Sequence, residues 1–101
     1  MDIKSELLEG ASPFVSVFTY DVLKREIILI LVDNPDQANN AKRVIIPDVL
    51  RYEEEIDELD DELMESIIGM HWINDETLCI KLENREIIVN TNGKPYSENV
   101  A

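Results

Sequence analysis

The sequence is poor in the residues that most often carry enzymatic chemistry. Its 101 residues include one cysteine, Cys79, and one histidine, His71, so the chain can form no internal disulfide and no zinc site with several Cys and His ligands. Its three glycines are scattered at positions 10, 69 and 93, which excludes a glycine-rich phosphate-binding loop. The longest apolar run, residues 27–32, has six residues, whereas a membrane-spanning helix needs about 20.

Basic residues are also scarce. There are 9 lysines and arginines against 22 acidic residues, which gives a formal net charge of −13. Nucleic acids and anionic membranes are therefore excluded as expected partners, because their phosphates would be repelled, whereas basic proteins are favoured. The single cysteine and the absence of an apolar signal-type segment near residue 1 predict a protein of the reducing cytoplasm.

What is present is typical of a folded domain. Apolar residues make up 45% of the chain and charged residues 31%, which predicts one domain over residues 1–101. Alternating or continuous apolar residues predict strands at 14–20, 27–32, 44–46, 70–73, 78–82 and 87–89. Short connections between these strands, including the turn at Asn92-Gly93, favour antiparallel pairing.

Two helices are expected beside the strands. Apolar residues at helical spacing predict a short helix over residues 2–9, which Gly10 would cap and Pro13 would stop. Residues 33–43 are predicted to be a polar loop, and the segment from Lys94 a loose polar tail. The predicted fold class is therefore α+β, a single domain with a mainly antiparallel sheet of about five strands and one or two helices.

The second helix is expected in the most acidic segment, residues 53–65, where nine of 13 residues are acidic and none is basic. Apolar residues recur there every three or four positions and would face a core, with the acids facing outward: Ile56, Leu59, Leu63, Ile67 and Ile68. An alternative is a strand that continues to Ile56, because Leu50, Tyr52, Glu54 and Ile56 alternate. The helix is the favoured interpretation.

Catalytic and metal-binding roles find little support. Cys79 follows His71 by eight residues across a predicted turn, so the two could be cross-strand neighbours, but a lone cysteine or histidine is more often structural. A calcium loop needs a glycine at its sixth position, and residues 53–65 contain none. We therefore predict no catalytic residue, no metal site and no cofactor.

The acidic segment is instead predicted to bind a basic protein. Solvated helix faces usually alternate the two signs of charge, whereas like charges four residues apart destabilise a helix. A chain that keeps such uncompensated charge has a use for it when a cationic partner is present. The predicted partner-binding residues are Tyr52, Glu53, Glu54, Asp57, Glu58, Asp60, Asp61 and Glu62.

In its size, its acidity, its predicted α+β layout and its lack of catalytic residues, the chain resembles the immunity proteins of bacterial polymorphic toxin and contact-dependent inhibition systems. The resemblance implies an inhibitor that forms a tight one-to-one complex with a cognate toxin domain in the cytoplasm. A nuclease toxin suits this role, because its phosphate-binding active site is positive. Two alternatives are a DNA mimic and a small oligomerising domain in which strand 27–32 or 87–89 pairs with another copy.

Overall fold

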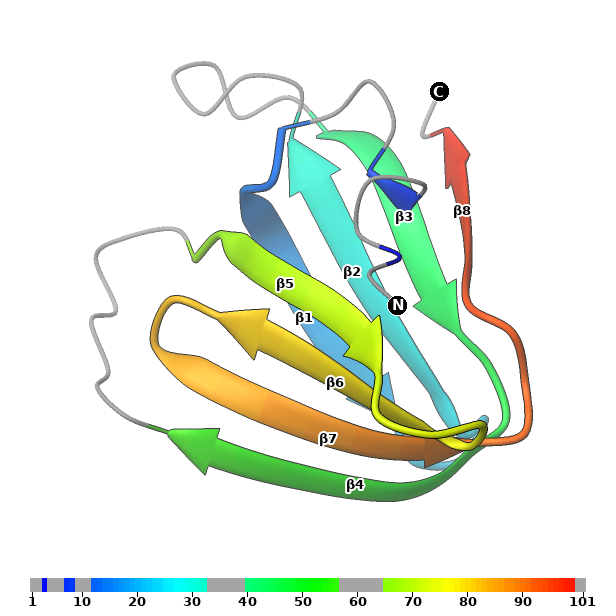
Figure 1. Cartoon of the computed structure of the whole chain (residues 1–101). Coiled ribbons are helices and arrows are strands. Elements are labelled where there is room, and N and C mark those ends of the chain that lie inside the picture. Colours follow the sequence, from blue (N-terminus) through cyan, green and yellow to red (C-terminus); the bar gives the residue numbers. More distant parts are fainter. Residues whose placement is uncertain (1–2, 4–6, 9–11, 33–39, 57–64, 100–101) are drawn as a thin grey trace.

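The computed structural model describes residues 3, 7–8, 12–32, 40–56 and 65–99. These residues form eight strands in two four-stranded antiparallel sheets that face each other (Figure 1). The strands are β1 (Val15–Asp21), β2 (Glu26–Val32), β3 (Asn40–Ile46), β4 (Val49–Ile56), β5 (Ile67–Trp72), β6 (Thr77–Leu82), β7 (Arg85–Thr91) and β8 (Tyr96–Asn99).

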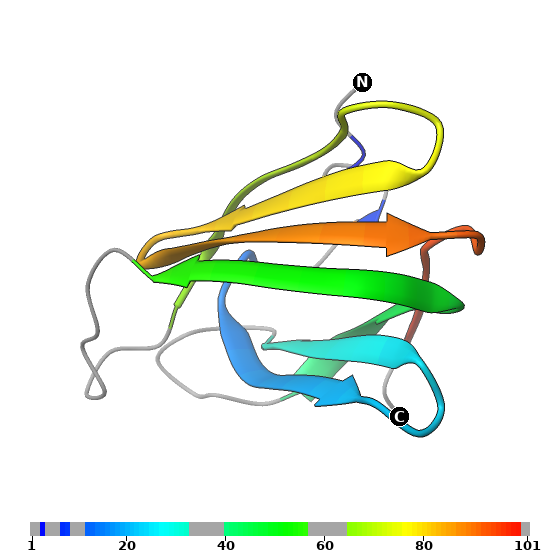
Figure 2. The same cartoon turned by 90° about the horizontal axis from the view of Figure 1, so that it is seen from below.

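Strand order shows how the chain passes between the sheets. The first sheet has the order β1-β2-β3-β8 and the second the order β4-β7-β6-β5. The chain leaves the first sheet at Pro47 and Asp48, and it returns to it after β7 to add β8 (Figure 2). Pro47 ends β3 because proline has no N–H to donate, and Asp48 turns the chain with a φ of 51°.

The core lies between the two sheets, and alternating residues supply it. On β2, Ile27, Leu29 and Leu31 are fully buried, and every second side chain of β6 faces them from the other sheet. Those side chains are Leu78, Ile80 and Leu82. Burial of each such leucine or isoleucine contributes about 1.5–3 kcal/mol, so these two central strands provide much of the driving force for folding.

Hydrogen bonds tie the sheets together at two corners. At one corner the N–H of Val15 donates to the carbonyl of Glu65 at 2.8 Å, and the N–H of Ile67 donates to that of Pro13 at 2.9 Å. At the other corner the N–H of Val49 donates to the carbonyl of Arg25 at 2.8 Å. Between these corners the edge strands β1 and β4 face each other, and side chains fill the space.

The α+β prediction is wrong, because the described residues form strands in both sheets and no helix. The predicted helix over 53–65 fails at its start, since residues up to Ile56 belong to β4 and pair with β7. The strand alternative is therefore confirmed up to Ile56. Cross-strand pairing with β7 overrides helical spacing here. Residues 57–64, and most of the predicted helix over 2–9, lie outside the described residues.

Of the other predictions, some are confirmed and some are wrong. The strands at 14–20, 27–32, 78–82 and 87–89 and their antiparallel hairpins are confirmed. The loose tail after Lys94 is wrong, because β8 pairs with β3, and residues 40–43 of the predicted loop also belong to β3. Since β2 and β7 each have a neighbour on both sides, neither can pair with a strand of another copy.

Candidate functional site

The acidic residues of β4 point to two different sides of the second sheet. A shift of register between Val49 and Arg51 places Tyr52 opposite Val89 and Glu54 opposite Ile87, both of which are buried in the core. Tyr52 and Glu54 therefore face the first sheet, whereas Glu53 and Glu55 face outward. Consequently the predicted binding residues on β4 do not form one surface.

Glu54 is held by an arginine of the neighbouring strand. Nη1 of Arg85 lies 2.8 Å from Oε1 of Glu54, and its Nη2 lies 2.9 Å from Oε1 of Glu65. Nε of Arg85 donates to Oε2 of Glu65 at 3.1 Å, so that pair is bidentate. Burial lowers the pKa of Arg85, but its bonds to Glu54 and Glu65 outweigh this effect and raise the pKa overall. The Arg85 guanidinium is thus a fixed cation between two carboxylates.

Tyr52 is part of the same internal cluster. Its ring stacks on Tyr20 with centroids 4.7 Å apart, and its hydroxyl donates to Oε2 of Glu54 at 3.3 Å. Burial, followed by the negative charge of Glu54, raises the pKa of Tyr52 to about 12. Tyr52 and Glu54 therefore close the space between the edge strands, which gives them a structural role there, and their predicted binding role stays a prediction.

A groove of about 370 Å³ runs along β4 and β7, and the inward residue Glu54 borders it together with outward residues. Its lining comprises Glu53, Glu54, Glu55, Glu86 and Ile88. We call the outward side chains of Glu53, Glu55, Glu86 and Ile88 the acidic groove. Register explains its composition, because Glu53 lies opposite Ile88 and Glu55 lies opposite Glu86 on β7.

The carboxylates of the acidic groove differ in whether they form an ion pair. Arg51 forms an ion pair with Glu53. Lys81 on β6 lies opposite Glu86, but within the described part of the chain no ion pair joins a cation to Glu86 or Glu55. Like charges directly opposite each other destabilise an antiparallel pair. Glu55 and Glu86 are therefore the carboxylates of the groove that form no ion pair with a described residue, although Lys81 is a neighbour of Glu86.

Most of the predicted acidic site cannot be placed. Asp57, Glu58, Asp60, Asp61 and Glu62 lie outside the described residues, so their role remains a prediction. Sequence reasoning missed Glu86 and Ile88, which β7 brings beside β4. The signal available for them was the apolar run at 87–89, which directly follows Glu86 and was predicted as a strand, but it identifies neighbours only once the strand order is known.

Cys79 and His71 are cross-strand neighbours on β6 and β5. The Cys79 thiol is buried, and burial followed by the charge of Glu86 raises its pKa. A catalytic cysteine needs the opposite shift, toward the thiolate. Over the described ranges no cluster of three or more His, Cys, Asp or Glu side chains could hold a metal ion. Nor is any helix found there that is long and apolar enough to cross a membrane.

Comparison with known proteins found no matching protein family, no similar curated protein and no similar solved structure. The acidic groove and a second cleft beside Trp72 are hollows in the described surface.

Proposed function

We propose that the chain is an acidic protein-binding domain that inhibits a basic partner and uses the acidic groove as part of its interface. The opposed pair of Glu55 and Glu86 carries this proposal. Two opposed carboxylates, neither of them in an ion pair with a described residue, cost stability in the free domain, and a lysine or arginine of a partner would offset that cost. Ile88, which lies opposite Glu53 in the same groove, would supply an apolar contact to the partner.

Acidic side chains on an edge strand also have a simpler explanation. Charge on an edge discourages pairing with edges of other molecules, and β4 is an edge strand. That explanation accounts for Glu53 and Glu55. It does not account for Glu86, which lies on the inner strand β7, where no edge needs protection. Glu86 therefore favours a binding role for the groove.

The resemblance to immunity proteins suggests which basic partner to test. Of the features behind it, the α+β layout is wrong, while the size and the acidity of the chain stand. A nuclease toxin presents lysines and arginines where it binds phosphates, and the acidic groove has the complementary charge. We therefore infer a toxin inhibitor that covers such a site. A DNA mimic has no specific observation in its favour.

The test is capture of partners from the native host at low and high salt, followed by inhibition assays with the purified partner. The double variant Glu55→Gln/Glu86→Gln should weaken inhibition of a captured basic nuclease about tenfold or more. A matched control, Glu26→Gln/Asp48→Asn, removes the same charge elsewhere and should retain inhibition. Equal inhibition by the groove variant and the wild type would overturn the role of the groove.

A further inference from the structure

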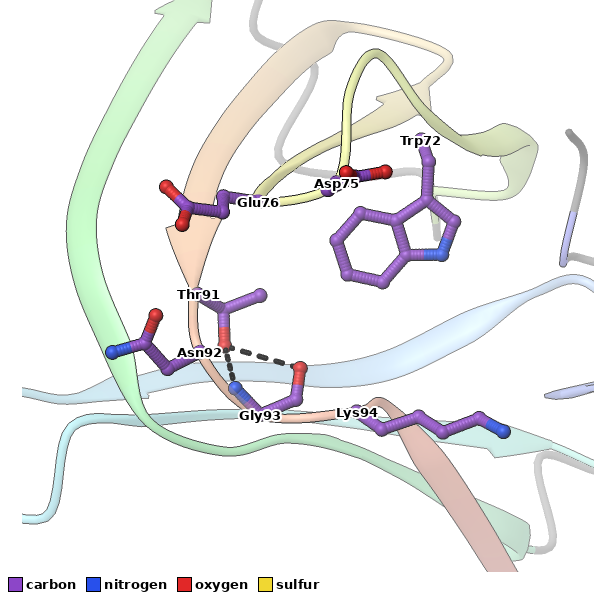
Figure 3. A pocket seen from close by; sticks show the side chains of 7 residues that line it. All are labelled: Trp72, Asp75, Glu76, Thr91, Asn92, Gly93 and Lys94. Atoms are coloured by element: carbon purple, nitrogen blue, oxygen red, sulfur yellow. Dashed lines mark hydrogen bonds between the residues drawn. The ribbon is translucent and has the colours of Figure 1, made fainter.

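A second cleft, of about 390 Å³, lies where β5 and β7 end. We call it the Trp72 cleft, and Figure 3 shows the residues that line it: Trp72, Asp75, Glu76, Thr91, Asn92, Gly93 and Lys94. The indole stands on one side of the cleft and the Glu76 side chain on the other, with Asp75 between them (Figure 3). The acidic groove and this cleft share no lining residue.

Trp72 is an anchored wall of the cleft. It is the last residue of β5, it lies opposite Leu78 of β6, and its side chain is half-buried against the core. The rest of the indole faces the cleft. An aromatic side chain fixed in this way loses little conformational freedom when a ligand packs against it.

Hydrogen bonds from backbone N–H groups hold the opposite walls in place. Oδ1 of Asn74 accepts the N–H of Glu76 at 2.9 Å, which fixes the turn that carries Asp75. The N–H of Thr91 donates to the carbonyl of Glu76 at 2.9 Å and joins this turn to β7. Below it, the N–H of Gly93 donates to Oγ1 of Thr91 at 3.0 Å. The cleft is therefore preformed by the fold.

The lining of the cleft has a net negative charge. Asp75, Glu76 and Lys94 all line it, yet none of the three takes part in an ion pair with any described residue. Figure 3 shows the Lys94 side chain extending away from both carboxylates. Because the Lys94 side chain points away from Asp75, the space beside Asp75 is open to another cation (Figure 3).

We infer that the Trp72 cleft binds an organic cation, a guanidinium or alkylammonium group that packs on the indole of Trp72 and pairs with Asp75. Tryptophan is the aromatic side chain that attracts cations most strongly, and a nearby carboxylate adds a charge-assisted hydrogen bond. The net charge of −13 further raises the local concentration of cations. This inference stands independently of the proposed role of the acidic groove.

The chain offers a direct signal for this binding, because Trp72 is its one tryptophan. Argininamide, titrated into the protein, should change the fluorescence of Trp72 saturably. Citrullinamide, which has nearly the same shape without the charge, should cause no saturable change. Equal responses to both compounds, or to glucose as a neutral stacking ligand, would overturn the assignment of a cation site.

Two substitutions separate binding in the cleft from a general effect of charge. Asp75→Asn should weaken argininamide binding about fivefold or more, whereas Glu26→Gln, a loss of one charge on β2, should leave it unchanged. Lys94→Met should strengthen binding about two- to threefold, because it removes the one cation that lines the cleft. Unchanged affinity in both Asp75→Asn and Lys94→Met would contradict the inference even if the titration saturates.

The cation could belong to a protein partner or to a free amine. A short arginine-containing peptide and spermidine distinguish these sources in the same titration. Tighter binding of the peptide than of argininamide, with loss on replacement of its arginine by citrulline, assigns the cleft to a protein side chain. Tighter binding of spermidine assigns it to a free polyamine, and both results support the cation site.

Discussion

The guanidinium carbon of Arg85 lies 4.4 Å from the centroid of the Phe18 ring. Arg85 belongs to β7 of the second sheet and Phe18 to β1 of the first, so this cation–π contact joins the two sheets. The same guanidinium also binds Glu54 and Glu65. Arg85 is therefore the centre of the polar cluster that closes the space between the edge strands.

Replacement of Arg85 by methionine should destabilise the protein. The Arg85 side chain is only 18% exposed, and its loss removes the cation that the carboxylates of Glu54 and Glu65 bind. We expect the free energy of unfolding to fall by about 1–3 kcal/mol, measured by urea denaturation. Arg51→Met is the control, since Arg51 is 67% exposed and should matter by less than about 0.5 kcal/mol. Similar effects of the two substitutions would contradict the role of Arg85.

Because of Tyr52, the free energy of unfolding should fall as the pH rises from 10 to about 12. The unfolded chain loses this proton near pH 10.0, whereas the folded chain keeps it until about pH 12. The contribution of protonated Tyr52 is therefore complete below pH 10 and is lost as the pH rises toward 12. Between these values the free energy of unfolding should decrease more steeply in the wild type than in Tyr52→Phe. Parallel curves would show that the phenol is not perturbed.

Tyr52 can also be followed by its ultraviolet absorbance. The chain has three tyrosines, and one of them should ionise near pH 12 in the folded protein. In Tyr52→Phe this last step should disappear from the titration. Its persistence would assign the perturbed phenol to another tyrosine.

Two glycines should respond in opposite ways to alanine. A Cβ on Gly93 would lie 2.6 Å from Cγ and 2.9 Å from the carbonyl oxygen of Pro47, so Gly93→Ala should cost about 1–3 kcal/mol. A Cβ on Gly69, in β5, would meet nothing within 4 Å. Gly69→Ala should therefore raise the free energy of unfolding by up to about 1 kcal/mol, because it restricts the unfolded chain. Thermal unfolding of both variants provides the measurement.

Glu55→Lys should stabilise the free domain. The substitution places a cation opposite Glu86 and replaces a repulsive cross-strand pair by an attractive one. We expect a gain of about 0.2–1 kcal/mol at low salt that shrinks at high salt. Glu86→Gln in the same chain should remove most of the gain. A loss of stability in Glu55→Lys would show that the wild-type pair is not repulsive.

The strands that were predicted correctly from the sequence are those with a clear pattern of apolar residues within a few consecutive positions. Leu78, Ile80 and Leu82 alternate with Cys79 and Lys81, and this period alone identifies a half-buried strand. The end of β4 was ambiguous because Ile56 fits both a strand and a helix, and only pairing with β7 decides between them. Strand β8, with the sequence YSEN, has no apolar alternation, so its pairing with β3 could not be predicted.

The candidate site depended on information that the sequence does not contain. The shift of register between Val49 and Arg51 decides that Glu54 faces inward and that Glu53 and Glu55 face outward. No residue pattern within residues 49–56 reveals this shift. The Trp72 cleft likewise joins a turn near residue 75 to a turn near residue 93, which only the tertiary fold brings together.

The pairing of β8 with β3 has a consequence for how the chain folds. Lys42 pairs with Asn99 and Ile45 with Tyr96, so the first sheet stays incomplete until a segment more than fifty residues away has been synthesised. Pairing across such a separation closes a long loop and is slow compared with hairpin formation. During synthesis on the ribosome, β3 must therefore wait with one edge unpaired until β8 is made, and such an edge is open to association with other chains.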